Sequence, residues 1–214
     1  MTFGICMSLN VVDTAAPRPG DERKRSVGSS LTVDVFVSVD GWAGSDGLPG
    51  YFGYLGPELA EWIKTEGAAP QVVIMGRRTY EMLAGLPEEF RDEGWHRMSQ
   101  LDKVVFSRTL TQVSWTNTRL CGGPLRDEVR AMKDGGEVPL RTMGSLSVAR
   151  QLVDVGLVDR LRLMIFPLMA GPSGREAAFQ GIASADLELV DHQALDGRVL
   201  LVEYRPTGKD IPRA

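Results

Sequence analysis

Three short segments of the chain contain residues that suit phosphate binding, namely glycines, residues with hydroxyl groups and arginines. They are Gly76–Thr79, Ser107–Arg108 and Thr142–Ser147. Glycine lets backbone amides approach a phosphate closely, hydroxyl groups donate hydrogen bonds to it, and a guanidinium group binds it through two parallel hydrogen bonds. Each segment alone also suits a helix start with a surface arginine. Together they favour a ligand with several phosphate groups.

Two aspartates accompany the first apolar segment, Leu31–Gly41. Its residues alternate, with valines on one face and Asp34, Phe36, Ser38 and Asp40 on the other, as in a β-strand. Because an aspartate in mid-strand needs solvent or a role, we predict that Asp34 binds or protonates a substrate; a solvent-facing position is the alternative. Asp40 is a second candidate acid, and an Asp-Gly turn is its alternative.

A segment rich in glycine and aromatic residues follows, over residues 41–56. This composition is typical of a mobile flap over a site. We predict that Tyr51 and Phe52 stack on a planar substrate ring, and packing of the loop is the alternative. Pro57 and Gly67 then bound a predicted helix that turns apolar side chains toward the core.

The elements that must position these residues alternate along the chain. Short apolar runs precede each phosphate-binding segment, and helices are predicted after Pro124 and after Ser145. The last part, Leu187–Tyr204, contains two alternating runs about Asp196 and Gly197, which predicts a hairpin. This order indicates an α/β fold with a mostly parallel central sheet and an antiparallel C-terminal hairpin edge. In such sheets, loops at the carboxyl ends of strands meet at one edge.

The chain has 214 residues, of which 43% are hydrophobic, and suits one globular domain. We predict this domain over residues 31–206, with a tail over 207–214. Residues 1–30 are rich in proline, glycine, serine and charge without periodicity, which predicts a disordered extension.

Several function classes are disfavoured by composition. A net charge of -4 argues against nucleic acid or an anionic membrane as partner. No apolar segment approaches the roughly 18 residues of a membrane span, and the N-terminus lacks the pattern of a secretory signal. Two cysteines and two histidines lie far apart without metal-ligand spacing, so we predict no metal site, no disulfide framework and a cytoplasmic protein.

Four motifs now carry a resemblance: SVDGWAG, VVIMGRRTYE, VVFSRTL and RTMGSLSVARQLVDVGLVDRLRLMIFPLMAG. In this order and spacing they resemble the dihydrofolate-reductase-like superfamily, most closely the reductase domain of the RibD type, over about Leu31 to Arg205. The resemblance implies a dihydrofolate-reductase-like three-layer fold and NADPH as cofactor. It also implies hydride transfer to a pyrimidine- or pterin-like substrate, such as 5-amino-6-(5-phosphoribosylamino)uracil.

The resemblance also implies roles for individual residues. Ser107 and Arg108 are expected to bind the adenosine 2′-phosphate, and Arg77 is expected to reach this extra phosphate, whereas Arg78 is expected to face away. The turn before the later helix is expected to bind the pyrophosphate, and the loop after the first strand to lie beside nicotinamide and substrate. The predicted cofactor-binding residues are Ser38, Gly41, Gly76, Arg77, Thr79, Ser107, Arg108, Met143, Gly144, Ser145 and Leu146. The predicted substrate-binding residues are Phe36, Tyr51 and Phe52, and the predicted catalytic residues are Asp34 and Asp40.

Two positions depart from the superfamily. Leu59 occupies the place of the acid that dihydrofolate reductase keeps on its first helix, and Ser145 follows Gly144 where a second glycine is common. The first departure argues against folate reduction by the mechanism of dihydrofolate reductase. The alternatives are a dihydrofolate reductase-like activity, a flavin-dependent reductase and a non-catalytic NADPH-binding sensor. The resemblance further implies a homodimer that uses the late strands, with a monomer as the alternative.

Overall fold

The computed structural model describes residues 28–48 and 50–211, so nearly all of the predicted extension over residues 1–30 lies outside the described part. The strands are β1 (Leu31–Ser38), β2 (Trp42–Ser45), β3 (Val72–Gly76), β4 (Asp102–Phe106), β5 (Thr118–Cys121), β6 (Leu140–Thr142), β7 (Arg160–Phe166), β8 (Gly174–Ala177), β9 (Leu187–Leu195) and β10 (Val199–Pro206). The helices are α1 (Pro57–Ala68), α2 (Arg77–Ala84), α3 (Glu93–Gln100), α4 (Leu125–Gly135) and α5 (Leu146–Asp154), with short 3-10 helices η1 (Gly50–Gly53), η2 (Glu88–Phe90) and η3 (Gly171–Ser173).

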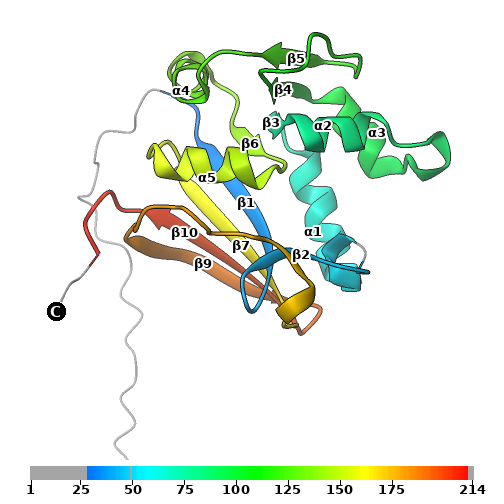
Figure 1. Cartoon of the computed structure of the whole chain (residues 1–214), viewed down its shortest axis with the longest axis vertical. Helices are drawn as coiled ribbons and strands as arrows, with labels where there is room; N and C mark the ends of the chain where they lie inside the picture. Colours follow the sequence, from blue (N-terminus) through cyan, green and yellow to red (C-terminus); the bar gives the residue numbers. More distant parts are fainter. Residues whose placement is uncertain (1–27, 49, 212–214) are drawn as a thin grey trace, which may run out of the picture.

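An eight-stranded sheet organises the fold, in the order β5-β4-β3-β6-β1-β7-β10-β9 (Figure 1). The strands from β5 to β7 are parallel, and β10 and β9 form an antiparallel hairpin at one edge. A separate two-stranded ribbon pairs β2 with β8. The predicted α/β class with its antiparallel edge is confirmed.

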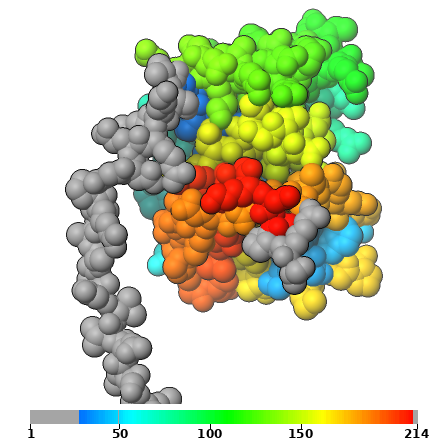
Figure 2. Space-filling model, turned by 90° about the vertical axis from the view of Figure 1, so that its left-hand side faces the viewer, coloured from blue at the N-terminus to red at the C-terminus, as the bar shows by residue number. Residues whose placement is uncertain are grey.

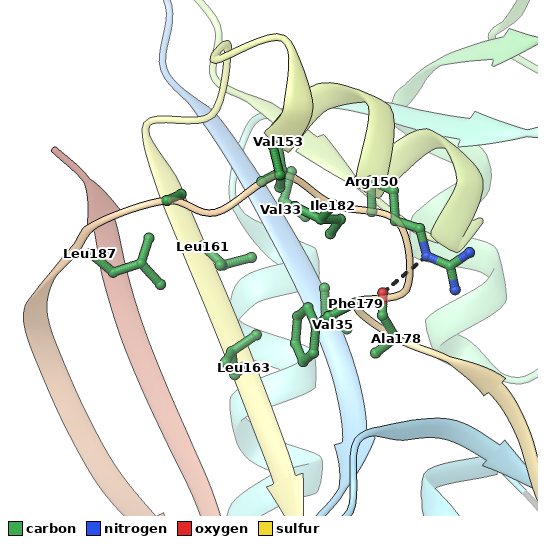
Figure 3. A pocket seen from close by; sticks show the side chains of 13 residues that line it. Val33, Val35, Arg150, Val153, Leu161, Leu163, Ala178, Phe179, Ile182 and Leu187 are labelled. Carbon is green, nitrogen blue, oxygen red and sulfur yellow. Dashed lines mark hydrogen bonds between the residues drawn. The ribbon is translucent and has the colours of Figure 1, made fainter. Parts of the chain in front are cut away.

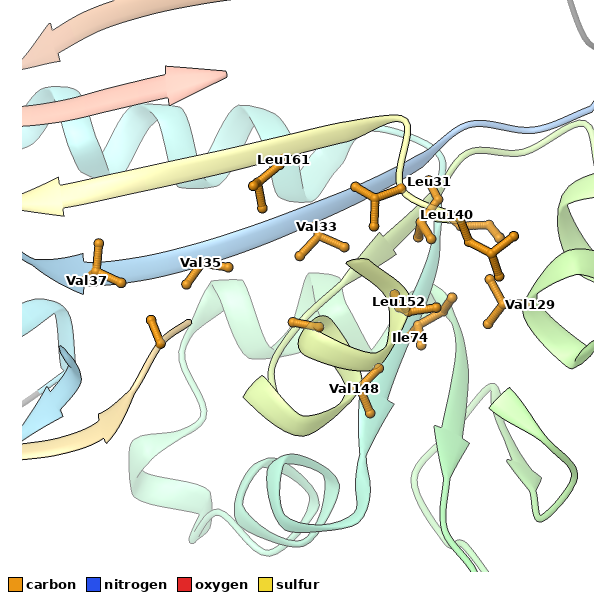
Figure 4. Packing of buried hydrophobic residues seen from close by; sticks show 14 residues of the cluster. Leu31, Val33, Val35, Val37, Ile74, Val129, Leu140, Val148, Leu152 and Leu161 are labelled. Carbon is orange, nitrogen blue, oxygen red and sulfur yellow. The ribbon is translucent and has the colours of Figure 1, made fainter. Parts of the chain in front are cut away.

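The alternation of β1 separates two faces of the sheet. Val33, Val35 and Val37 are buried in a cluster that also contains residues of α4 and α5 (Figure 4). Burial of these apolar side chains stabilises the fold, at about 25 cal/mol for each Å² removed from water. The opposite face of β1 therefore carries Asp34 and Phe36.

That opposite face is covered by α1, α2 and α3. One apolar cluster joins Leu59 of α1 to Met164 and Phe166 of β7, and a second joins Tyr80 of α2 to Met75 of β3. Helices thus lie on both faces of the sheet, which gives three layers. The face under α1 is where the polar side chains of β1 must find partners.

The tip of the β9–β10 hairpin is attached to the start of α1. The Asp196 carboxylate accepts hydrogen bonds from the backbone N–H groups of Glu58 (2.9 Å) and Leu59 (3.2 Å). These groups have no acceptor within the first turn of a helix, so Asp196 acts as a cap from a distant part of the chain. The hairpin turn predicted at Asp196 therefore also fixes α1.

Candidate functional site

The predicted phosphate-binding segments lie at the ends of neighbouring parallel strands. In the sheet, β4, β3, β6 and β1 are adjacent in that order, so their exits share one edge. Three spacings of about 4.8 Å give this row a width of roughly 14 Å. From this row, α1 connects β1 to β3 over one face, whereas α5 connects β6 to β7 over the other. In open α/β sheets, ligands bind outside the carboxyl ends of strands whose connections diverge in this way.

Two of the turns are packed against each other. A Cβ atom added to Gly76 would lie 2.3 Å from the Ser145 hydroxyl, and one added to Gly144 would lie 2.8 Å from the Thr79 hydroxyl. Gly144 also has φ 53°, which favours glycine, and the Gly144–Ser145 peptide bond is cis. The glycines therefore allow the start of α2 and the start of α5 to approach closely.

The helix starts in these turns keep their backbone donors available. Within the described residues, no side chain caps α2 at Gly76 or α5 at Ser145, and α4 also begins without a side-chain cap. By contrast, α1 is capped by Asp196 and α3 by Asp92. Free N–H groups at a helix start, reinforced by the helix dipole, bind anions. The paired starts of α2 and α5 are thus suited to a phosphate-bearing ligand.

The arginines beside these turns differ in their partners. Arg77 pairs with Glu81 at 3.1 Å, and Arg78 lies 3.7 Å from Glu176 on β8. Arg108, at the exit of β4, is exposed and has no ion pair within the described residues. Exposed pairs contribute little to stability, so an incoming phosphate can compete with Glu81 for Arg77. Arg108 can bind a phosphate without first losing an ion pair.

The exit of β1 is closed by a hydrogen-bonded turn. Ser38 donates its hydroxyl proton to Asp40 at 2.6 Å and accepts the backbone N–H of Trp42 at 3.0 Å. Asp40 also accepts the N–H groups of Ala170 (3.0 Å) and Gly171 (2.8 Å), which ties this turn to the loop after β7. These bonds, that from Ser38 foremost, lower the pKa of Asp40 to about 2. An ionised Asp40 stabilises the turn and is a poor source of protons; its predicted catalytic role stays a prediction.

Asp34 lies in a buried ion-pair cluster. Its carboxylate accepts hydrogen bonds from Arg162 on β7 at 2.7 Å and from Arg141 on β6 at 2.5 Å, and its side chain is 8% exposed. Glu66 at the end of α1 binds the same two guanidinium groups, at 2.6 Å and 3.4 Å. Asp34 therefore does not face solvent. This ion pairing weighs against a proton-donor role for Asp34, which stays a prediction.

The cluster is compact and neutral. Trp62 of α1 lies beside it, with its ring centroid 5.1 Å from the Arg162 guanidinium and 5.5 Å from that of Arg141. Burial disfavours the charged form of Arg162, but the charges and hydrogen bonds of Asp34 and Glu66 outweigh this effect, so the pKa of Arg162 is raised. Neither of the two arginines nor Glu66 was predicted from the sequence. The available signal was the mid-strand arginine of β7, which pairs in register with Asp34.

Aromatic residues fill the space between η1 and the end of β1. Tyr51 lies 5.4 Å from Phe36, and Phe52 lies 5.4 Å from Phe166, measured between ring centroids. Phe52 is 7% exposed and belongs to the core cluster under α1. The structure therefore brings Phe36 and Tyr51 together, whereas Phe52 anchors the loop. Leu59, at the position compared with the acid of dihydrofolate reductase, is fully buried in the same cluster.

A separate apolar cavity of about 270 Å³ lies on the other face of the sheet (Figure 3). It is lined mainly by valine and leucine side chains of β1 and β7, by α5 and by the segment after β8. Arg150 on α5 fixes that segment by donating to the carbonyl oxygens of Ala177 and Ala178. None of the predicted site residues lines this cavity. It is therefore distinct from the row of strand exits.

In residues 28–48 and 50–211, no group of three or more histidine, cysteine, aspartate or glutamate side chains is placed to hold a metal ion. Over the same residues, no helix has the length and apolar character needed to cross a bilayer.

Comparison with solved structures supports the fold. A putative riboflavin biosynthesis protein from Shewanella sp. PV-4 is 16% identical, with a TM-score of 0.62, over 83% of this chain and 99% of that one. A pyrimidine reductase-like protein from Corynebacterium diphtheriae is 16% identical, with a TM-score of 0.60, over 85% and 93%. Dihydrofolate reductase from Enterococcus faecalis, complexed with NADP(H), is 16% identical, with a TM-score of 0.58, over 85% and 99%.

Comparison with protein families gives a clearer assignment than the low identities to solved structures. A search of curated proteins found no match. The RibD C-terminal domain family, however, matches residues 29–201, which include every predicted site residue. The chain therefore belongs to the RibD C-terminal domain family.

Proposed function

We propose that this protein is an NADPH-dependent reductase that transfers hydride to a pyrimidine- or pterin-like heterocycle. One observation carries the proposal: the uncapped starts of α2 and α5 are packed together in the middle of a row of parallel strand exits. The family supports a reductase role. The dihydrofolate-reductase-like neighbour that was solved with NADP(H) supports a nicotinamide cofactor.

The residues present fit a phosphorylated dinucleotide. Backbone N–H groups at the starts of α2 and α5 would hold the pyrophosphate, with the Thr79 hydroxyl and the Gly144–Ser145 turn between them. Arg108 and Arg77 would bind the 2′-phosphate, because their guanidinium groups lie at neighbouring strand exits and are exposed. When bound, NADPH supplies the hydride. The remaining predicted cofactor residues, Ser38 and Gly41, belong to the turn at the exit of β1.

The substrate would lie on the face of the sheet under α1. Phe36 and Tyr51 offer aromatic surface for a planar ring at the exit end of β1. Leu59 leaves this region without the acid expected for folate reduction. We therefore favour a heterocycle of the 5-amino-6-(5-phosphoribosylamino)uracil type over dihydrofolate.

Steady-state oxidation of NADPH, followed at the cofactor absorbance, tests this function. The assay compares 5-amino-6-(5-phosphoribosylamino)uracil with dihydrofolate, and NADPH with NADH. We expect turnover with the uracil derivative and NADPH. NADPH binding without oxidation by any substrate would instead favour the non-catalytic sensor, and absence of nucleotide binding would refute the proposal.

We propose further that two copies pair through the hairpin edge of the sheet. Strand β9 lies on the face of the molecule that Figure 2 shows, and it is exposed along nearly its whole length. It carries Leu189, which is 54% exposed. An edge strand with apolar side chains is a template for pairing with another strand. Light scattering coupled to gel filtration would give twice the chain mass, and a monomer at micromolar concentration would contradict this arrangement.

The family role supports a cytoplasmic location, which also stays a proposal.

A further inference from the structure

Reduction of a C=N or C=O group by hydride requires a proton for the heteroatom. The acids near the exit of β1 are already engaged. Asp34 and Glu66 bind two arginines, and Asp40 accepts three hydrogen bonds in its turn. The hydroxyl of Tyr54 donates to the carbonyl of Pro167 at 3.5 Å. The donor must therefore be another group.

Tyr51 is the phenol that remains. Within the described residues its hydroxyl has no protein hydrogen-bond partner, and the residue is half-buried. Its ring lies 5.4 Å from Phe36 and 6.5 Å from Phe166, measured between centroids. Phe36 lies two residues, or about 7 Å, before the end of β1 at Ser38. Tyr51 therefore packs against the part of β1 that leads to the strand exit. The phenol is thus at the substrate end of the proposed site.

The backbone at Tyr51 has an unfavourable conformation. Tyr51 and Phe52 have φ values of 55° and 50°, in the left-handed region that non-glycine residues seldom adopt. Such conformations persist where surrounding packing imposes them, and they concentrate at functional sites. Here burial of Phe52 in the core fixes the segment, and the carbonyl of Tyr51 accepts the N–H of Tyr54 at 2.9 Å. The result is a rigid presentation of the Tyr51 ring.

The surroundings keep this phenol protonated before reaction. Burial, and then the negative charge of Asp92 at the start of α3, raise the pKa of Tyr51, and the positive charge of Arg141 on β6 opposes them. At neutral pH the hydroxyl therefore carries its proton. Arg141 also supplies positive charge that would stabilise a transient phenolate.

We propose that the Tyr51 hydroxyl donates the proton that the substrate heteroatom gains during reduction. The inference rests on the proposed function and deepens it. The nicotinamide cofactor is oxidised by two electrons as hydride forms a new C–H bond. The Tyr51 O–H bond breaks, an N–H or O–H bond forms on the substrate, and the phenolate regains a proton from water.

The test compares Tyr51→Phe with Tyr54→Phe, in the full chain with NADPH and 5-amino-6-(5-phosphoribosylamino)uracil. Tyr51→Phe keeps the ring and removes only the proton, so we expect kcat to fall at least about 100-fold while KM changes less than about threefold. NADPH affinity, measured by titration calorimetry, and the melting temperature should stay at wild-type values. Tyr54→Phe should keep wild-type kcat.

The dependence of the rate on pH provides a second readout. In the wild type, kcat should fall at alkaline pH as Tyr51 loses its proton, and the residual rate of Tyr51→Phe should lack this limb. A Tyr51→Phe variant with kcat within threefold of wild type would overturn the inference and leave the proposed function intact. A wild-type protein that binds NADPH but reduces no substrate would overturn both.

Discussion

The substitution Asp34→Asn removes one charge from the buried cluster that joins β1, β6, β7 and α1. Asp34 and Glu66 balance Arg141 and Arg162, so the variant leaves one net positive charge in a largely buried place. Removal of one member of a buried ion pair costs about 3–5 kcal/mol. For a domain of this size each kcal/mol lowers the melting temperature by about 2–4 °C, so the expected loss is about 6–20 °C.

Urea unfolding followed by tryptophan fluorescence, together with a thermal scan, measures this loss. Asp46→Asn is the matched control, because Asp46 pairs with Arg175 on the surface, where the expected change is below about 1 kcal/mol. The double variant Asp34→Asn/Arg162→Met restores neutrality and should lose less stability than the sum of the two single variants. An Asp34→Asn variant within 1 kcal/mol of wild type would refute the structural role of the cluster.

Three further predictions concern the turns and the hairpin. Gly76→Ala places a methyl group against the Ser145 hydroxyl and should weaken NADPH binding about tenfold in calorimetry. The double variant Gly76→Ala/Ser145→Ala removes the closest of the new contacts and should recover part of the affinity. Because the pKa of Asp40 is lowered to about 2, its contribution to stability is present above about pH 4 and is lost as the pH falls toward 2. The difference in melting temperature between the wild type and Asp40→Asn should therefore shrink over that pH range. A constant difference would contradict this prediction. Asp196→Gly removes the cap of α1 and suits the left-handed backbone at this position (φ 52°), so it should cost about 1 kcal/mol in urea unfolding; an unchanged free energy of unfolding would contradict this.

The sequence predicted the fold because its hydrophobic patterns are regular. The alternation over Leu31–Ser38 predicted the strand and both of its faces, and the turn at Asp196 predicted the hairpin. The neighbouring positions of the β3 and β6 exits depend on strand order, which local patterns do not contain and which was not predicted. The resemblance implied the three-layer arrangement, and the structure confirms it.

The side-chain partners within the site were harder to predict. Asp34 was expected to be buried, but Arg141 and Arg162 are far away in sequence and become its neighbours only when β6 and β7 flank β1. The turn at Asp40 could be anticipated, whereas its bonds to Ala170 and Gly171 join segments about 130 residues apart. The role of Phe52 was also hard to predict, because an aromatic side chain suits both a ligand-binding surface and the hydrophobic core.

The central claim is that the starts of α2 and α5 form a binding site for a 2′-phosphorylated dinucleotide. Calorimetric titration of the purified chain with NADPH and with NADH tests this claim most directly. We predict one NADPH site per chain, weaker binding of NADH, and an Arg108→Met variant that loses most of this preference; Arg126→Met, a charge removal on α4, is the control. No binding of either nucleotide would contradict the account.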